Sequence, residues 1–455
     1  MVPRVSNLIQ RATLQKGAQE GSAWAFALRA LRYRNYRLFF GGQSVSLIGT
    51  WMTRIATSWL VYRLTHSALL LGLVGFSLQI PILFLGPFAG VWVDRWDRHR
   101  TLIVTQVLSM LQSFWLAALA LAGAISIGDI IALSLFQGAI NAFDMPARQA
   151  FVVQMVEDRT DLSNAIALNS SMVNGARLLG PSLAGIIIAA VGEGYCFLLD
   201  GISYIAVIAS LLAMHIAVAQ PRPQRTHVLA ELKEGWRYAT QFTPIRSILL
   251  LLGLVSLVGM PYTVLMPIFA GSVLHGGAHT LGFLMGASGV GALAGALVLA
   301  TRRSVLGLGR VVTATAMGFG IGLASFAFSR WLALSLPLMA VTGFCMMQHM
   351  ASSNTILQTI VEEDKRGRVM SFYSMAFQGT APFGSLIAGA VAGRIGAPVT
   401  LMIGGGLCVL GGVWFACRLG EIRKVVRPIY RQLGIIPEVA AGMQAAANLS
   451  TSSRE

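Results

Sequence analysis

The chain has 455 residues, of which 55% are hydrophobic and only 11% are charged. So few charged residues cannot cover the surface of a soluble protein of this length, which excludes a soluble globular domain and predicts a polytopic helical membrane protein. The formal net charge of +16 is interpreted by position, because the cytoplasmic loops of membrane proteins collect Lys and Arg. It indicates orientation in a bilayer and not nucleic-acid binding.

Twelve apolar runs are long enough to cross the hydrocarbon core of a bilayer as helices. Six lie in the first half, at residues 38–62, 67–91, 101–123, 128–150, 165–190 and 195–217, and six lie in the second half, at residues 246–271, 280–301, 310–328, 332–357, 369–393 and 397–417. We therefore expect a cytoplasmic segment 1–36, a first six-helix half 37–217, a cytoplasmic linker 218–245, a second six-helix half 246–417 and a basic cytoplasmic tail 418–455.

The positions of the basic residues predict the topology. Of the 34 Lys and Arg, 29 fall in the N-terminus, the even-numbered loops, the linker and the C-terminus. This asymmetry predicts a multi-pass protein of the cell (inner) membrane with both termini and the linker in the cytoplasm. The four cysteines lie in or beside apolar runs without paired spacing, so no disulfide framework and no metal site is expected.

A short charged loop separates the second and third apolar runs. It contains Gly90, Asp94, Arg95 and Arg98 in the order Gly-x-x-x-Asp-Arg-x-x-Arg. This pattern resembles the loop between helices 2 and 3 of the major facilitator superfamily of transporters, where the Gly permits close helix packing and the Asp-Arg pair locks the two halves together. In this chain Asp97 stands where that family usually has a second Gly.

Two further patterns favour the same superfamily. The stretch from Val156 to Arg159 before the fifth span is echoed about 205 residues later by the stretch from Val361 to Arg366. Such an internal repeat is typical of a fold built from two parallel six-helix halves. Span 5 contains Gly180 and Pro181, followed by Gly185, and resembles the motif of major facilitator exporters. A Pro there removes a backbone donor and is expected to bend the helix.

Several shorter motifs of the first half resemble one branch of the superfamily. They are Gly49-Thr-Trp51, Leu64-Thr65-x-Ser67-Ala68, Phe143-Asp144-x-Pro146-Ala-Arg148-Gln149 and Asn164-Ala-x-Ala-Leu-Asn169-Ser170. They look most like the enterobactin-exporter-like and macrolide-efflux-like transporters. The resemblance implies export of an amphipathic organic solute, such as a siderophore, a drug or a secondary metabolite, by alternating access. No nucleotide-binding loop is present, which favours a secondary transporter, and the family leads us to expect proton-coupled antiport.

Charged residues inside the spans are costly and are therefore candidates for function. Asp144 and Arg148 lie one helical turn apart, close enough to pair, and the resemblance places Asp144 in a gating network with Arg98 of the charged loop. Arg177 lies near the middle of span 5, where a guanidinium needs an anion. That anion is either a membrane acid, Asp144 or Asp200, or an anionic group of the substrate.

The remaining candidates are weaker. The long side chain of Arg54 is expected to reach the membrane surface. Gln137 lies in span 4, where Ser134 replaces the Arg that many proton-coupled exporters carry. Gln348 and His349 lie in span 10, which should line the pathway, although a lone membrane histidine is more often a packing residue.

These observations leave two other functions open. A lipid or lysolipid translocator shares the fold, and the absence of acidic residues from the spans of the second half would suit such an apolar cargo. A membrane enzyme or a receptor-like scaffold is disfavoured, because no cluster of His, Asp or Glu suggests a catalytic site. The expected partners are a small organic substrate, protons and the lipid bilayer, with no nucleic acid and no cofactor, and we expect a monomer.

Overall fold

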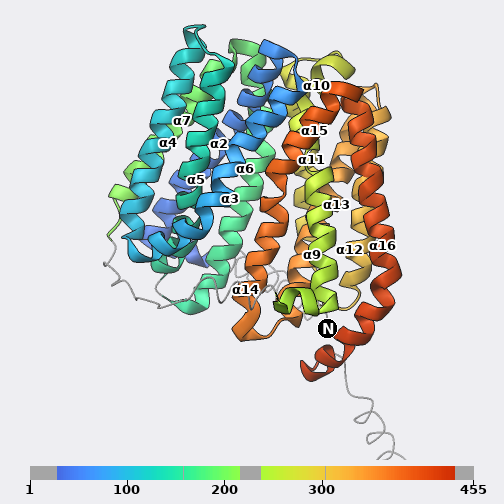
Figure 1. The fold of residues 1–455 in the computed structure, drawn as a ribbon. Coiled ribbons are helices and arrows are strands. Elements are labelled where there is room, and N and C mark those ends of the chain that lie inside the picture. The colour runs from blue at the N-terminus through green and yellow to red at the C-terminus, as the bar shows by residue number, and fades with distance from the viewer. Residues whose placement is uncertain (1–27, 157, 216–236, 303, 436–455) are drawn as a thin grey trace, which may run out of the picture. The chain divides into compact units, whose positions relative to one another are not determined.

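The computed structural model describes residues 28–156, 158–215, 237–302 and 304–435 (Figure 1). Nearly all of these residues are helical, and no strand occurs among them. Within these described ranges, ten helical segments are long and apolar enough to cross a membrane. The predicted all-α membrane fold is therefore confirmed.

The described part of the first half of the chain forms six long helices. A 3-10 turn, η1 (Arg29–Arg32), precedes α2 (Arg34–Thr65), α3 (Ala68–Arg95), α4 (Arg98–Leu121), α5 (Ile127–Met155), α6 (Leu162–Val191) and α7 (Glu193–Leu212), with a second 3-10 turn, η2 (Arg159–Asp161), before α6. Each helix contains one of the six predicted apolar runs or most of it.

The residues described from 237 onward form six more helical segments, two of which contain π-helical turns. The first consists of α9 (Thr243–Leu254), η3 (Val255–Gly259), α10 (Tyr262–Ile268) and η4 (Phe269–Val273). It is followed by α11 (Ala278–Ala300), α12 (Leu308–Phe328), α13 (Leu332–Ile360), then α14 (Glu363–Ser374), η5 (Met375–Gly379) and α15 (Ala381–Ile395) as one segment, and α16 (Ala397–Gln432). The segments α2 and α14–α15 are the two that are not among the ten that are both long and apolar enough.

Contacts between Cα atoms divide the chain into two compact units. Unit 1 contains residues up to Thr57 and Phe84–Pro223, and unit 2 contains Ser58–Leu83 and the residues from Gln224 onward. Within unit 1, α4 lies beside α5 and α7. Within unit 2, α12 lies beside both α13 and α16, and α13 also packs against α11.

Small residues bring the helices of unit 2 close together. A Cβ atom added at Gly291 of α11 would overlap the backbone of Ala340 in α13, and one added at Gly343 of α13 would overlap the backbone of Ser288 in α11. Within the same unit, Gly72 of α3 touches the backbone of Ser385 in α15. Such close approach increases the van der Waals contact between helices. This contact drives helix association in lipid, where the hydrophobic effect does not.

The loop between α3 and α4 is shorter than the stretch 92–100 that separates the predicted spans, because both helices extend into it. Only Trp96 and Asp97 separate the two helices. The Asp97 carboxylate caps α4, because it accepts hydrogen bonds from the backbone N–H groups of His99 at 2.9 Å and Arg100 at 3.2 Å. The residue that replaces the usual glycine therefore starts the next helix.

Candidate functional site

Unit 1 contains a polar stripe that the sequence analysis missed. The residues concerned lie on α4 at helical spacing, and none is more than 5% exposed: Thr105, Gln106, Ser109, Gln112 and Ser113. Polar side chains at intervals of three, four and seven residues within an apolar run share one helix face. That periodicity was the available signal, and it was overlooked because the residues are uncharged.

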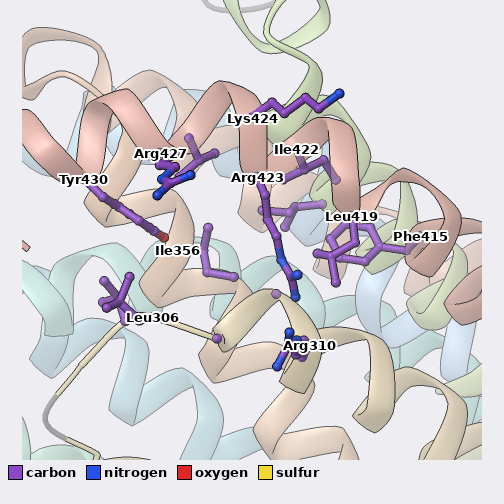
Figure 2. A pocket seen from close by; sticks show the side chains of 15 residues that line it. Leu306, Arg310, Ile356, Phe415, Leu419, Ile422, Arg423, Lys424, Arg427 and Tyr430 are labelled. Carbon is purple, nitrogen blue, oxygen red and sulfur yellow. The ribbon is translucent and has the colours of Figure 1, made fainter. Parts of the chain in front are cut away.

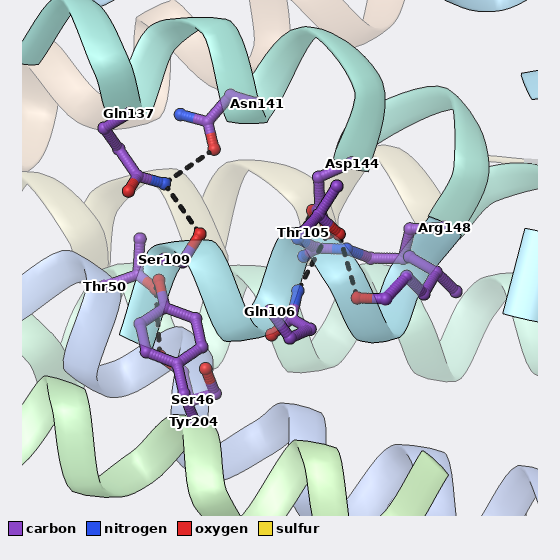
Figure 3. Close-up of polar contacts among 11 residues, drawn as sticks. Ser46, Thr50, Thr105, Gln106, Ser109, Gln137, Asn141, Asp144, Arg148 and Tyr204 are labelled. Carbon is purple, nitrogen blue, oxygen red and sulfur yellow. Dashed lines mark hydrogen bonds and ion pairs between the residues drawn. The ribbon is translucent and has the colours of Figure 1, made fainter. Parts of the chain in front are cut away.

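Asp144 of α5 lies at one end of this stripe (Figure 3). Its Oδ1 atom accepts hydrogen bonds from the Thr105 hydroxyl at 3.0 Å and from the Gln106 amide at 2.8 Å. Its Oδ2 atom forms an ion pair with Arg148, one turn further along α5. The carboxylate is thus held by one cation and two neutral donors, which fixes its position between α4 and α5.

Gln137 of α5 contacts the middle of the stripe. Its amide nitrogen donates to the Ser109 hydroxyl at 3.2 Å and to Asn141 Oδ1 at 3.1 Å (Figure 3). The Gln137 Oε1 atom is buried and has no hydrogen-bond partner among the described residues. A buried amide with a spare acceptor can receive a donor from a water or a substrate.

Asp200 of α7 lies at the other end of the stripe and is surrounded by hydroxyl groups. Its Oδ2 atom accepts from Thr53 of α2 at 2.8 Å and from Ser113 of α4 at 2.9 Å. Its Oδ1 atom is buried without a hydrogen-bond partner, and no ion pair of Asp200 occurs among the described residues. A Cβ atom at Gly49 would lie 2.7 Å from that oxygen, so the glycine of the Gly49-Thr-Trp51 motif lets α2 approach α7 here.

Two arginines meet at one aromatic ring in unit 1. The guanidinium carbon of Arg54 lies 4.7 Å from the centre of the Trp51 ring, and that of Arg177 lies 5.7 Å from it. Both distances are within the range of a cation–π interaction. Arg54 belongs to α2 and Arg177 belongs to α6. The two positive charges therefore lie beside the same ring, which the sequence did not predict.

The glycine–proline motif of α6 explains how these groups come together. Gly180, Pro181 and Gly185 are all buried in α6, which continues through the proline to Val191. A Cβ atom at Gly180 would overlap Trp51 and lie 3.0 Å from the Ile48 carbonyl oxygen of α2. The motif thus brings α6 against α2 beside the shared ring.

Gln348 and His349 lie in unit 2 and are packed between helices. The Gln348 amide donates to the Gly295 carbonyl of α11 at 3.1 Å, and His349 Nδ1 lies 3.3 Å from the Val312 carbonyl of α12. Each makes a bond that holds α13 to its neighbour. These contacts favour the packing interpretation for His349, although its Nε2 atom has no hydrogen-bond partner among the described residues.

The predicted gating loop is described only in part. Arg95 is exposed, and Arg98 is half-buried at the start of α4. The side chain of Asp94 and the surroundings of Gly90 lie outside the described residues. The pairing of Arg98 with Asp144, and the locking role of the loop, stay predictions.

An N-terminal clamp is a second feature that the sequence analysis missed. Asp161, before α6, is only 2% exposed and forms ion pairs with Arg29 at 2.8 Å and Arg32 at 2.7 Å. The Tyr33 hydroxyl donates to the same carboxylate at 3.0 Å. Asn164 accepts from the Ala30 backbone N–H at 3.0 Å, which gives a structural role to the Asn164 motif.

No group of three or more metal-ligating side chains occurs among the described residues. What the described part of unit 1 offers instead is Asp144 and Asp200 at the two ends of the polar stripe, the neutral donors and acceptors of that stripe, and two arginines on Trp51. Charged and polar groups within long apolar helices are typical of membrane proteins that move solutes or ions. The fold and these groups define a multi-pass membrane transporter.

Comparison with known proteins agrees with that class. The family model described as "Transmembrane secretion effector" matches residues 23–428, so the chain belongs to this family of the major facilitator superfamily. The resemblance inferred from the motifs is confirmed, and the protein is a transporter and not an enzyme.

Individual relatives are similar over most of their length. The staphyloferrin A transporter of Staphylococcus aureus is 27% identical over 77% of this chain and 88% of its own. The enterobactin exporter EntS of Citrobacter koseri is 24% identical over 89% of this chain and 97% of its own. The crystal structure of the nucleoside transporter NupG is similar in fold, with a TM-score of 0.64 at 18% identity, over 86% of this chain and 99% of that one.

Proposed function

We propose that this protein exports an amphipathic organic solute with an anionic group, in exchange for protons, by alternating access. The observation that carries the proposal is the pair of arginines on Trp51. Two guanidinium groups from α2 and α6 share one ring in the apolar part of unit 1, where an anion bound between them would offset the cost of placing both charges there. The indole supplies an apolar surface for the rest of the molecule.

The substrate class follows from that chemistry and from the relatives. A guanidinium presents a planar set of donors that matches carboxylate and other oxyanion groups. Two relatives carry names that refer to staphyloferrin A and enterobactin. We infer a siderophore or a similar secondary metabolite, and a multidrug range is the second candidate within export.

Asp200 is the residue that we propose carries the proton. Its described partners are hydroxyl groups, so it can take up and release a proton without breaking an ion pair among the described residues. Asp144 differs, since its charge is already paired with Arg148. We assign Asp144, together with Gly90, Asp94, Arg95 and Arg98, to the gate.

The proposal is tested by substrate retention in intact cells. Cells that lack their own exporters are loaded with radiolabelled enterobactin or a radiolabelled macrolide, with and without the protein. We expect the protein to lower retention of at least one probe and a protonophore to abolish the difference. If neither probe is exported while a labelled lysophospholipid is moved between leaflets, the lipid-translocator alternative replaces this proposal.

The arginine site is tested in the same assay. We expect Arg177→Gln to reduce export by about tenfold or more, the equivalent of one lost charge-assisted contact. Arg177→Lys should give an intermediate loss, because a point charge does not replace a planar fork. Arg330→Gln removes an exposed charge from a loop of unit 2 and is the control. Wild-type export by Arg177→Gln at normal protein levels would contradict the anion site.

A further inference from the structure

A cavity of about 370 Å³ lies within unit 2, between α9, α12, α13 and the far end of α16 (Figure 2). Its floor is apolar and buried: Ile248, Ile356 and Phe415 are each no more than 5% exposed. Its rim is basic. Arg310, Arg423, Lys424 and Arg427 belong to its lining, and the Lys424 side chain extends away from the other three.

The positive charge of this basic cavity is not balanced within the described structure. None of its lining residues is acidic. None of the four rim cations forms an ion pair with a described residue, and all four are exposed. Four like charges around one opening repel each other, so an anion bound there would relieve that repulsion.

The length of α16 sets the depth of the cavity relative to a bilayer. The helix has 36 residues and is therefore about 54 Å long, whereas the hydrocarbon core is about 30 Å thick. The apolar part of α16 ends near Cys417. Arg423 and Arg427 follow about 9 and 15 Å further along the helix, beyond the hydrocarbon core, and their long side chains can reach back toward the lipid headgroups.

We propose that the basic cavity binds one anionic phospholipid. Its phosphate lies among Arg310, Arg423 and Arg427, and the upper part of one acyl chain lies on the apolar floor. Basic pockets between membrane helices at this depth recognise anionic headgroups, and guanidinium groups bind phosphate oxygens with two parallel hydrogen bonds. The apolar floor is what selects a lipid over a free phosphate ion.

Because the cavity lies between α12 and α16, a lipid bound in it would link these two helices. Arg310 belongs to the start of α12, and Arg423 and Arg427 belong to the extension of α16. One phosphate between them bridges two helices whose basic ends would otherwise repel. The inference concerns a lipid that stays bound to unit 2, and it is independent of the substrate proposed above.

The experiment is native mass spectrometry of the full-length protein after exchange into mixed micelles with phosphatidylglycerol or phosphatidylcholine. We expect the wild-type chain to retain one phosphatidylglycerol molecule and far less phosphatidylcholine. Arg423→Gln with Arg427→Gln should lower phosphatidylglycerol retention by about tenfold or more, since each basic residue near the surface contributes severalfold to anionic-lipid binding.

Matched variants separate the cavity from the general charge of α16. Arg418→Gln with Arg431→Gln removes the same charge from the same helix, at two residues that do not line the cavity, and should leave retention unchanged. Leu306→Trp fills the cavity without changing charge and should lower it.

Three results would overturn the proposal: equal loss in both arginine pairs, equal retention of the two lipids, or displacement of phosphatidylglycerol by millimolar inorganic phosphate. The first would indicate only a basic helix surface, the second a lipid site that does not recognise charge, and the third an anion site without a lipid requirement.

Discussion

At the scale of single residues, Asp97 links a departure from the family pattern to a local function. Its carboxylate caps α4 through the backbone N–H groups of His99 and Arg100. We expect Asp97→Ala to destabilise the protein by about 1 kcal/mol, which lowers the melting temperature in detergent by about 2 °C. Asp97→Asn keeps an acceptor oxygen and is the control. An unchanged melting temperature for Asp97→Ala would show that the cap contributes no stability.

Two of the buried acids of unit 1 show what could be predicted from the sequence at this scale. Asp144 and Asp200 stood out because charges are rare in apolar runs, and the pairing of Asp144 with Arg148 followed from their spacing. The hydroxyl partners of Asp200 did not, because Thr53 and Ser113 belong to other helices. Periodicity shows which residues share a helix face but not which helix lies opposite.

At the scale of helices, Gly180 shows why α6 can lie against α2. A methyl group there would overlap Trp51 and press on the Ile48 carbonyl. We expect Gly180→Ala to cost about 1–3 kcal/mol through overpacking, and to lower both the melting temperature and the yield of folded protein. Gly175→Ala is the matched control on the same helix, since nothing lies within 4 Å of its Cβ position.

That control should be neutral or slightly stabilising, because Ala favours a helix over Gly by up to about 1 kcal/mol. Equal stability of the Gly180 and Gly175 variants would show that the helices separate at no cost, and close packing at Gly180 would then have no energetic importance.

Hydropathy predicts where the helices lie, but it does not predict all of their ends. The apolar runs were predicted to within a few residues, because about 20 apolar residues in a row have few alternatives to a spanning helix. The end of α16 was missed by 15 residues, Gln432 against 417. The charged residues after Cys417 ended the apolar run, but they are good helix formers, and Ile422 and Val426 give the extension a buried face.

At the scale of the whole molecule, the charge asymmetry predicts that both termini and residues 218–245 face the cytoplasm. Most of that linker lies outside the described residues. In a background with Cys417→Ser, we expect a cysteine placed at Gln224 to resist a membrane-impermeant maleimide in intact cells. A cysteine placed at Ala124, exposed in the loop between α4 and α5, should react. The opposite labelling pattern would reverse the topology.

We propose that an outward solute flux is coupled to inward proton movement through Asp200. The most direct measurement uses proteoliposomes that contain the purified protein and a pH gradient, and it records enterobactin flux and internal pH together. In the wild type, we expect each flux to require the other. We expect Asp200→Asn to abolish proton movement but still to exchange labelled for unlabelled solute. Gradient-driven transport by Asp200→Asn at the wild-type rate would contradict the account.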